Sequence, residues 1–159
     1  MAIYMQYDGI KGDVTTEGFK EWIDLSSLQF GVGRSITMTT GKAANRAHGA
    51  PSFSEITVSR EFDMSSVGLL QSVVSGTDGK KVKLVIVESN GKDLKKYVEY
   101  ELEDVMVSSY SVSSGGGVPA ESISLSYTKI TMSYTASDKS GKQGQVPRVT
   151  YDLATAKAS

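Results

Sequence analysis

The residues most able to do chemistry are four carboxylates close together in the chain, Glu99, Glu101, Glu103 and Asp104. Paired carboxylates can supply the acid and base of glycoside hydrolysis, or the oxygen ligands of a calcium site. The three glutamates alternate with other residues, which places them on one face of a β-strand. The simpler interpretation is a polar strand face balanced by lysines on a neighbouring strand. A hydrolase that uses Glu99 and Glu101 is therefore the least favoured of three hypotheses for the function.

The single histidine, His48, lies in a stretch without a clear apolar period, from about residue 39 to 52. A catalytic histidine needs a nucleophile or an orienting carboxylate, and the sequence places neither beside it. The pairs Gly41-Lys42 and Gly141-Lys142 lack the Ser or Thr and the earlier glycine of a phosphate-binding loop. We therefore expect no enzyme activity, no metal and no cofactor.

The composition excludes further classes of protein. The chain has 159 residues, no cysteine and a formal net charge of -1, from 17 Lys and Arg against 18 Asp and Glu. Without cysteine there is no disulfide framework and no thiolate nucleophile, and a nucleic-acid partner would require a basic excess. The first residues lack the basic and apolar regions of a secretory signal, and no stretch approaches the ~20 apolar residues of a membrane span. We expect one domain over residues 1–159, with no nucleic-acid partner and no membrane insertion.

The elements that must position any site are mainly strands. Valine, isoleucine, threonine and tyrosine greatly outnumber leucine, which favours pleated sheet. A change of phase near Thr128-Lys129 predicts a β-bulge, and bulges let a sheet curl. The fold expected is a closed or nearly closed β-barrel of two curved sheets with one short flanking helix. Extended patterns cover residues 3–7, 22–30, 36–38, 56–62, 82–87, 97–112, 121–136 and 146–153.

One helix interrupts these strands. Val67, Leu70 and Val74, with Leu69 and Val73 beside them, follow helical spacing, so we expect this apolar stripe to cover one mouth or flank of the sheet structure. Ser65 or Ser66 is the expected N-cap, and Gly76 the expected left-handed residue after the helix.

The charged residues on either side of Asn90-Gly91 predict the register of a β-hairpin. Asn90-Gly91 is a strong signal for a tight turn. Lysines precede the turn and glutamates follow it, so a register with even sums of paired residue numbers places Lys opposite Glu. A sum of 182, for example, would place Lys83 opposite Glu99.

The connection from Gly31 to Phe53 is long for a compact domain. Connections of this length are usually functional or disordered. A loop that protrudes toward a neighbouring copy would suit a protein that assembles with itself.

Several ordered segments resemble the haemolysin-coregulated proteins, the Hcp family. The N-terminal signature reads YDGIKGDVT, WIDLSS and QFGVGR, and the later segments read APS, YSVSSGG and YDLATAKA. Residues 63–89 and 137–146 depart from the family pattern. The resemblance nevertheless covers most of the chain.

The resemblance implies a tube subunit of the type VI secretion system. Members of that family form six-membered rings that stack into a hollow tube with a spike at its tip. A contractile sheath expels the tube with effector cargo, and some members carry or chaperone cargo in the ring lumen. Such a subunit is made in the bacterial cytoplasm and secreted without a cleaved signal peptide.

The resemblance also implies contact residues. The segment from 39 to 52 matches the family's protruding loop, which touches neighbouring subunits, so the expected contacts are Thr39, Thr40, Lys42, Arg46 and His48. The main alternative to the tube subunit is a monomeric β-barrel that binds a small ligand in an apolar cavity.

Overall fold

The structure, a computed structural model, describes residues 1–38, 40–41, 46–90, 93–135 and 146–159. Its single helix within these residues is α1 (Ser65–Ser75). The strands of the first half are β1 (Ala2–Tyr7), β2 (Ile23–Leu25), β3 (Ser27–Gln29), β4 (Val32–Gly33), β5 (Ile36–Met38), β6 (Arg46–His48), β7 (Ser52–Phe53) and β8 (Ile56–Glu61). Those of the second half are β9 (Lys80–Asn90), β10 (Asp93–Ser113), β11 (Ala120–Ser126), β12 (Lys129–Tyr134), β13 (Arg148–Asp152) and β14 (Lys157–Ala158).

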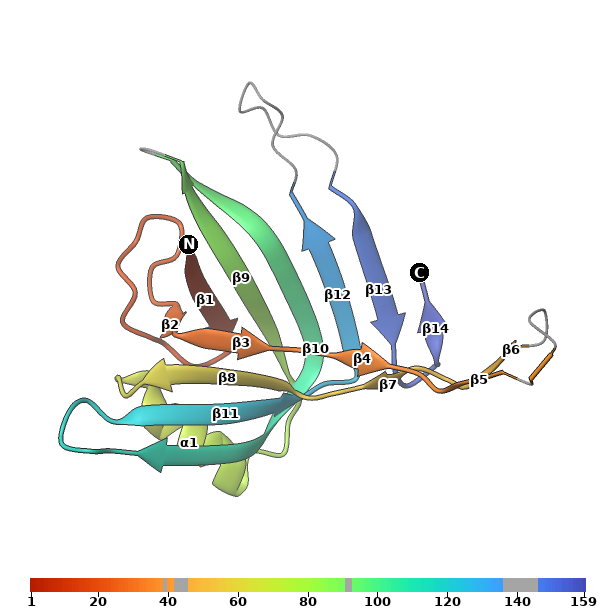
Figure 1. Ribbon diagram of the computed structural model, residues 1–159. Helices are drawn as coiled ribbons and strands as arrows, with labels where there is room; N and C mark the ends of the chain where they lie inside the picture. Colours follow the sequence, from red (N-terminus) through yellow and green to blue (C-terminus); the bar gives the residue numbers. More distant parts are fainter. Residues whose placement is uncertain (39, 42–45, 91–92, 136–145) are drawn as a thin grey trace.

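Ten strands form one antiparallel sheet centred on β10. The first half of β10 pairs with β9 and with β12, and its second half pairs with β11. The order continues outward as β9-β1-β2, as β12-β13-β14 and as β11-β8-β3, which gives an upper fan and a lower layer (Figure 1). The prediction of a mainly β fold with one helix is confirmed. A closed barrel is not, because no sheet in the described residues is closed by hydrogen bonds.

The chain also passes between the two layers at Ser26, which separates β2 from β3. Strand β2 pairs with β1 in the upper fan, whereas β3 pairs with β8 in the lower layer. The Ser26 N–H donates to the Ser59 carbonyl over 2.7 Å. The layers are therefore joined both at β10 and at the β2–β3 segment.

Strand β9 has apolar side chains on both faces, as its sequence predicts. Val82 and Leu84 belong to the main core. Val85 and Val87 form a second cluster with Phe19, from the loop between β1 and β2. The main core consists of Met5, Tyr7, Ile23, Leu25, Ile56, Val58, Leu69, Val82, Leu84, Leu102, Val105, Val107, Ile123, Leu125, Tyr127 and Ile130.

The long strand β10 bends at Asp104, which has a φ of 55°. This is the left-handed region that residues other than glycine rarely adopt. The pairing with β9 shifts between Leu102 and Val105, on either side of the bend. Gly79 lies directly against it, since a Cβ on Gly79 would be 2.8 Å from the Asp104 Cα. Gly79 therefore makes room for the bend in this strand.

The predicted bulge near Thr128-Lys129 is wrong. Strand β11 ends at Ser126 and β12 begins at Lys129, so the phase changes because the chain leaves one strand and starts another. Strand β11 pairs with the second half of β10 and β12 with its first half. The bulges occur in β10 instead, between Val107 and Ser109 and between Lys96 and Val98.

Only part of the predicted apolar stripe of α1 faces the sheet. Leu69 is buried as expected, whereas Val67 and Val74 are exposed. The buried face also includes Ser65 and Ser66. Ser65 and Ser66 lie inside the helix rather than at its N-cap. No helix in the described part of the chain is long and apolar enough to span a membrane.

Gly76 is extended, with a φ of -71°, so the predicted left-handed residue after the helix is wrong. A Cβ on Gly76 would lie 2.5 Å from the Ser72 carbonyl oxygen. Close approach of the chain to the last turn, rather than a positive φ, explains the glycine at this position.

The buried face of α1 is polar because it meets two buried charged side chains. Arg60 on β8 and Glu121 on β11 are only 1% and 2% exposed, and they lie opposite each other in the sheet. Arg60 donates to the Ser65 hydroxyl and pairs with Asp63, and the Ser66 hydroxyl donates to Glu121. Buried charges need such partners, and both hydroxyls must face inward to supply them.

The register of the β9–β10 hairpin has Lys83 opposite Glu101, with the Nζ and Oε1 atoms 4.0 Å apart. Paired numbers sum to 184 from Val98 to Leu102, so the predicted even sum is confirmed and the sum of 182 is wrong. Gly91 of the predicted turn lies outside the described residues.

Replacing Gly79 by alanine should destabilise the bend of β10. The added methyl group meets Asp104, and overpacking of this kind costs about 1–3 kcal/mol of unfolding free energy. Gly117→Ala is the matched control, because a Cβ there meets nothing within 4 Å. Urea unfolding should show a lower free energy of unfolding for Gly79→Ala and an unchanged one for Gly117→Ala. Equal stability of the two variants would contradict this role of Gly79.

Tyr110 should make the free energy of unfolding depend on pH in the alkaline range. Burial first, and then its hydrogen bond to Glu121 and that carboxylate's charge, raise the pKa of Tyr110 from 10.0 to about 12. Because the folded form holds this proton more tightly, its contribution is complete below pH 10 and is lost as pH rises toward 12. Urea unfolding across this pH range should show that the unfolding free energy of Tyr110→Phe falls less steeply with pH than that of wild type. The difference in slope corresponds to the release of at most about one proton. Parallel curves for variant and wild type would contradict the prediction.

Candidate functional site

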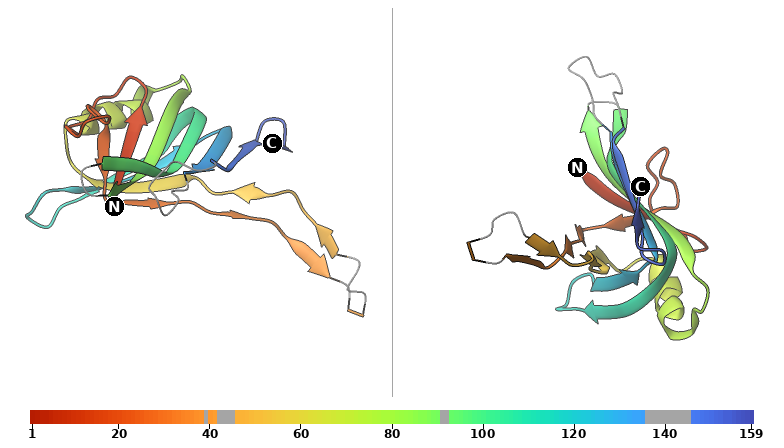
Figure 2. Two further views of the ribbon diagram at one scale, coloured as in Figure 1. Left: turned by 90° about the horizontal axis from the view of Figure 1, so that it is seen from above. Right: turned by 90° about the vertical axis from the view of Figure 1, so that its right-hand side faces the viewer.

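The described residues of the segments 31–38 and 46–53 leave the body as a narrow ribbon of paired strands (Figures 1 and 2). Strand β4 pairs with β7, and β5 pairs with β6 farther out. Arg46 lies opposite Met38, and His48 opposite Ile36. Thr40 is exposed, whereas Thr39 and Lys42 lie outside the described residues. The expected protruding loop is thus a ribbon with its own strand pairing.

Hydrogen bonds hold the two sides of the ribbon together at its root. The Ser54 N–H donates to the Gly31 carbonyl over 2.9 Å. The Ser54 hydroxyl accepts from the Gly31 N–H at 3.0 Å and donates to the Gly31 carbonyl at 2.9 Å. The Tyr127 hydroxyl donates to the Ser54 carbonyl at 2.8 Å. Burial first, and then the negative charge of Glu55, raise the pKa of Tyr127 to about 12, so this hydroxyl remains a donor at neutral pH.

Aromatic side chains attach the same root to the upper fan. Phe53 stacks on Tyr151 of β13 with ring centres 4.6 Å apart. Phe30 lies 5.7 Å from Tyr100 of β10 and 6.3 Å from Phe53. Pairs of this kind contribute about 0.5–1.5 kcal/mol each beyond the area that they bury. The sequence pattern did not predict this aromatic cluster, because its members come from distant segments. The one available signal was a phenylalanine beside each end of the long connection.

An apolar groove lies beside the aromatic cluster, between the ribbon root and strands β12, β13 and β14. Its volume is about 340 Å³, and none of the described residues that line it is charged. Met132 and Val149, which are paired across β12 and β13, contribute exposed side chains to it.

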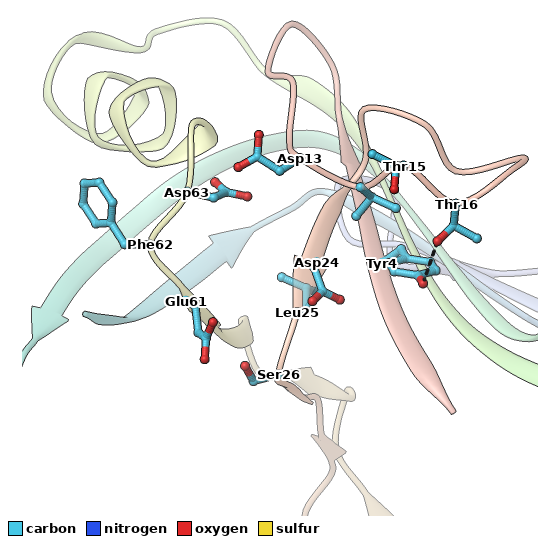
Figure 3. A pocket seen from close by; sticks show the side chains of 11 residues that line it. Tyr4, Asp13, Thr15, Thr16, Asp24, Leu25, Ser26, Glu61, Phe62 and Asp63 are labelled. Carbon is cyan, nitrogen blue, oxygen red and sulfur yellow. Dashed lines mark hydrogen bonds between the residues drawn. The ribbon is translucent and has the colours of Figure 1, made fainter. Parts of the chain in front are cut away.

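A larger hollow of about 550 Å³ lies between the β1–β2 loop and the end of β8. Its carboxylates come from Asp13, Asp24, Glu61 and Asp63 (Figure 3). Asp63 is engaged by Arg60, and Asp13 accepts a 3.4 Å hydrogen bond from the Met64 N–H. No group of three or more acidic, histidine or cysteine residues in the described ranges is arranged to hold a metal ion.

The glutamates of β10 belong to a balanced polar sheet face. Lys83 lies 4.0 Å from Glu101, and Lys129 lies 4.0 Å from Glu103. These side chains are largely exposed, so each ion pair contributes little to stability. The structure therefore supports the interpretation of a polar strand face with opposite lysines.

Comparison with known proteins identifies the class to which this arrangement belongs. The family model described as "Type VI secretion system effector, Hcp" matches residues 4–134. The chain belongs to the Hcp family of type VI secretion proteins. No curated protein matches it.

Solved structures agree over nearly the whole chain. One described as a type six secretion system protein has 28% sequence identity and a TM-score of 0.90, with 99% of each chain covered. Hcp1 from Salmonella typhimurium has 21% identity and a TM-score of 0.80, with 99% of this chain and 98% of that chain covered. A type VI secretion system effector from Yersinia pestis has 22% identity and a TM-score of 0.74, with coverage of 94% and 98%. The last two matches show the fold alone.

Truncating Phe53 should loosen the ribbon root more than it destabilises the body. Phe53→Ala removes the stack on Tyr151, and we expect it to weaken the attachment of the ribbon root to the body by about 1–3 kcal/mol. Trypsin should then cleave faster after Arg34, which is exposed on the ribbon. The control is Phe62→Ala, since Phe62 is exposed at the end of β8. Equal cleavage rates for both variants and wild type would mean that the stack does not hold the ribbon.

Proposed function

We propose that this chain is a structural tube subunit of the type VI secretion system and has no enzymatic role. Residues 1–159 form one domain that assembles into hexameric rings, and the rings stack into a hollow tube. The observation that carries this proposal is the Hcp family match over residues 4–134. We also propose that the two layers close into a barrel, which is supported by their joining at β10 and at the β2–β3 segment.

The ribbon is the part of the domain best suited to reach a neighbouring copy. It projects well beyond the body (Figure 2), and its apolar residues Val32 and Ile36 are exposed. Its root is fixed by hydrogen bonds and aromatic contacts, so it extends in a defined direction. We propose that Thr39, Thr40, Lys42, Arg46 and His48 lie at or near contacts between subunits, within or between rings.

We propose the remaining partners because the chain belongs to the Hcp family. The tube meets a spike protein at its tip, is surrounded by a contractile sheath and delivers effectors, some of which it carries or chaperones in its lumen. The subunit is made in the bacterial cytoplasm and leaves through the secretion machine without a cleaved signal peptide. A net charge of -1 allows identical copies to pack without strong mutual repulsion.

The ribbon contacts can be tested by reversing charge. Lys42→Glu with Arg46→Glu should raise the protein concentration needed for assembly by about tenfold or more, which corresponds to about 1.4 kcal/mol. Light scattering over a range of concentrations measures the mass of the particles. Glu99→Gln with Glu101→Gln is the control, and it should assemble like wild type because these residues lie on the polar sheet face. A wild-type chain that stays monomeric at high micromolar concentration would contradict the tube subunit and favour the ligand-binding monomer.

A further inference from the structure

Helix α1 has an apolar face that is exposed on the surface. Val67, Leu70 and Val74 are 70%, 46% and 77% exposed, and their spacing places them on one side of the helix. The eleven-residue helix contains no charged side chain. A helix on the surface of a soluble protein normally turns a charged or polar face to water. A contiguous apolar row without charges is typical of an interaction site rather than of scattered surface residues.

This exposure follows from the interior of the protein. Ser65 and Ser66 must face inward to meet Arg60 and Glu121, which turns Val67 and Val74 outward. Gly68 lies against Ile10, where an added Cβ would be 3.4 Å from the isoleucine side chain. The helix therefore cannot rotate to bury Val67 without breaking the hydrogen bonds of the two serines.

The apolar groove beside the ribbon root has matching chemistry. It is uncharged and lined by side chains that include Phe30, Phe53, Met132, Val149 and Tyr151. Its volume of about 340 Å³ suits the side chains of one helix face, whereas a whole helix of this length occupies far more. Helix faces bind such grooves through apolar residues at i, i+3 and i+7, which is the spacing of Val67, Leu70 and Val74.

The two surfaces lie at opposite ends of the body. Helix α1 is at one end, and strands β13 and β14, which form one side of the groove, are at the other (Figures 1 and 2). Complementary surfaces at opposite ends of one chain produce head-to-tail contacts, which close into a ring when the rotation between copies allows it.

We propose that the α1 face of one copy docks into the apolar groove of the next copy and makes the contact that closes the ring. This inference rests on the proposed ring-forming function and names the two surfaces involved. The occupant of each surface is a second copy of this chain, because the same chain carries both halves of an uncharged pair.

The test uses one variant for each surface. The helix variant carries Val67→Glu and Val74→Lys, which place a negative charge near the N-terminus of α1 and a positive charge near its C-terminus, as the helix dipole prefers. The groove variant carries Met132→Asp and Val149→Asp. Each variant alone should sediment as a monomer, because every contact needs one intact copy of each surface. An equal mixture should sediment as a dimer and nothing larger, since the groove variant's helix fits the helix variant's groove. Val118→Asp is the matched control, an exposed valine outside both surfaces, and it should assemble like wild type.

The outcomes separate this inference from the proposed function. If wild type forms rings and the two variants also form them, the ring stands and these surfaces do not close it. If wild type stays monomeric, the proposed function itself fails. If both variants are monomeric but the mixture gives no dimer, the two surfaces do not bind each other.

A second measurement does not depend on whether those variants fold. The chain has no cysteine, so Val67→Cys with Val149→Cys introduces the only thiols. A short bismaleimide should convert this variant into a ladder of linked copies. Val118→Cys with Val149→Cys should remain single chains. Equal cross-linking of the two pairs would overturn the assignment of the surfaces.

Discussion

The bend of β10 at Asp104 is the constraint on which the rest of the structure depends. One strand of 21 residues pairs with β9 and β12 before the bend and with β11 after it, so the direction of both layers is set there. A left-handed backbone at Asp104 is tolerated because Gly79 has no side chain to collide with it. Without the bend, β8, β11 and the helix would not lie opposite the upper fan.

The network of buried charges around Arg60 and Glu121, which includes the ion pair of Arg60 with Asp63, determines which side of the helix faces water. Replacing a buried ion pair by apolar residues is often neutral or stabilising, whereas removing one partner is strongly destabilising. We therefore interpret this network as a device for orientation more than for stability. It keeps the hydroxyls of Ser65 and Ser66 in the interior and leaves Val67 and Val74 exposed, where a partner copy can cover them.

Sequence patterns predict the parts of this protein that depend on local rules. Alternation located most of the strands, because side chains on a strand alternate between faces. Charge predicted a register with Lys opposite Glu, although Lys83 lies opposite Glu101 rather than Glu99. The helix was located correctly, but its buried face was only partly predicted, because the partners of Ser65 and Ser66 include a residue on the distant strand β11. The aromatic cluster at the ribbon root joins Phe30 and Phe53 to Tyr100 and Tyr151, and no local pattern indicates such distant contacts. The ordered family-like segments, by contrast, could be read from the chain directly.

The central claim is that identical copies of this domain close into a hollow ring. Negative-stain electron microscopy of the purified wild-type chain tests it most directly, because class averages display the symmetry and any central hole. The account predicts hollow six-fold rings, with stacks of rings at higher concentration. Fields of single small particles at high micromolar concentration, without rings, would contradict it.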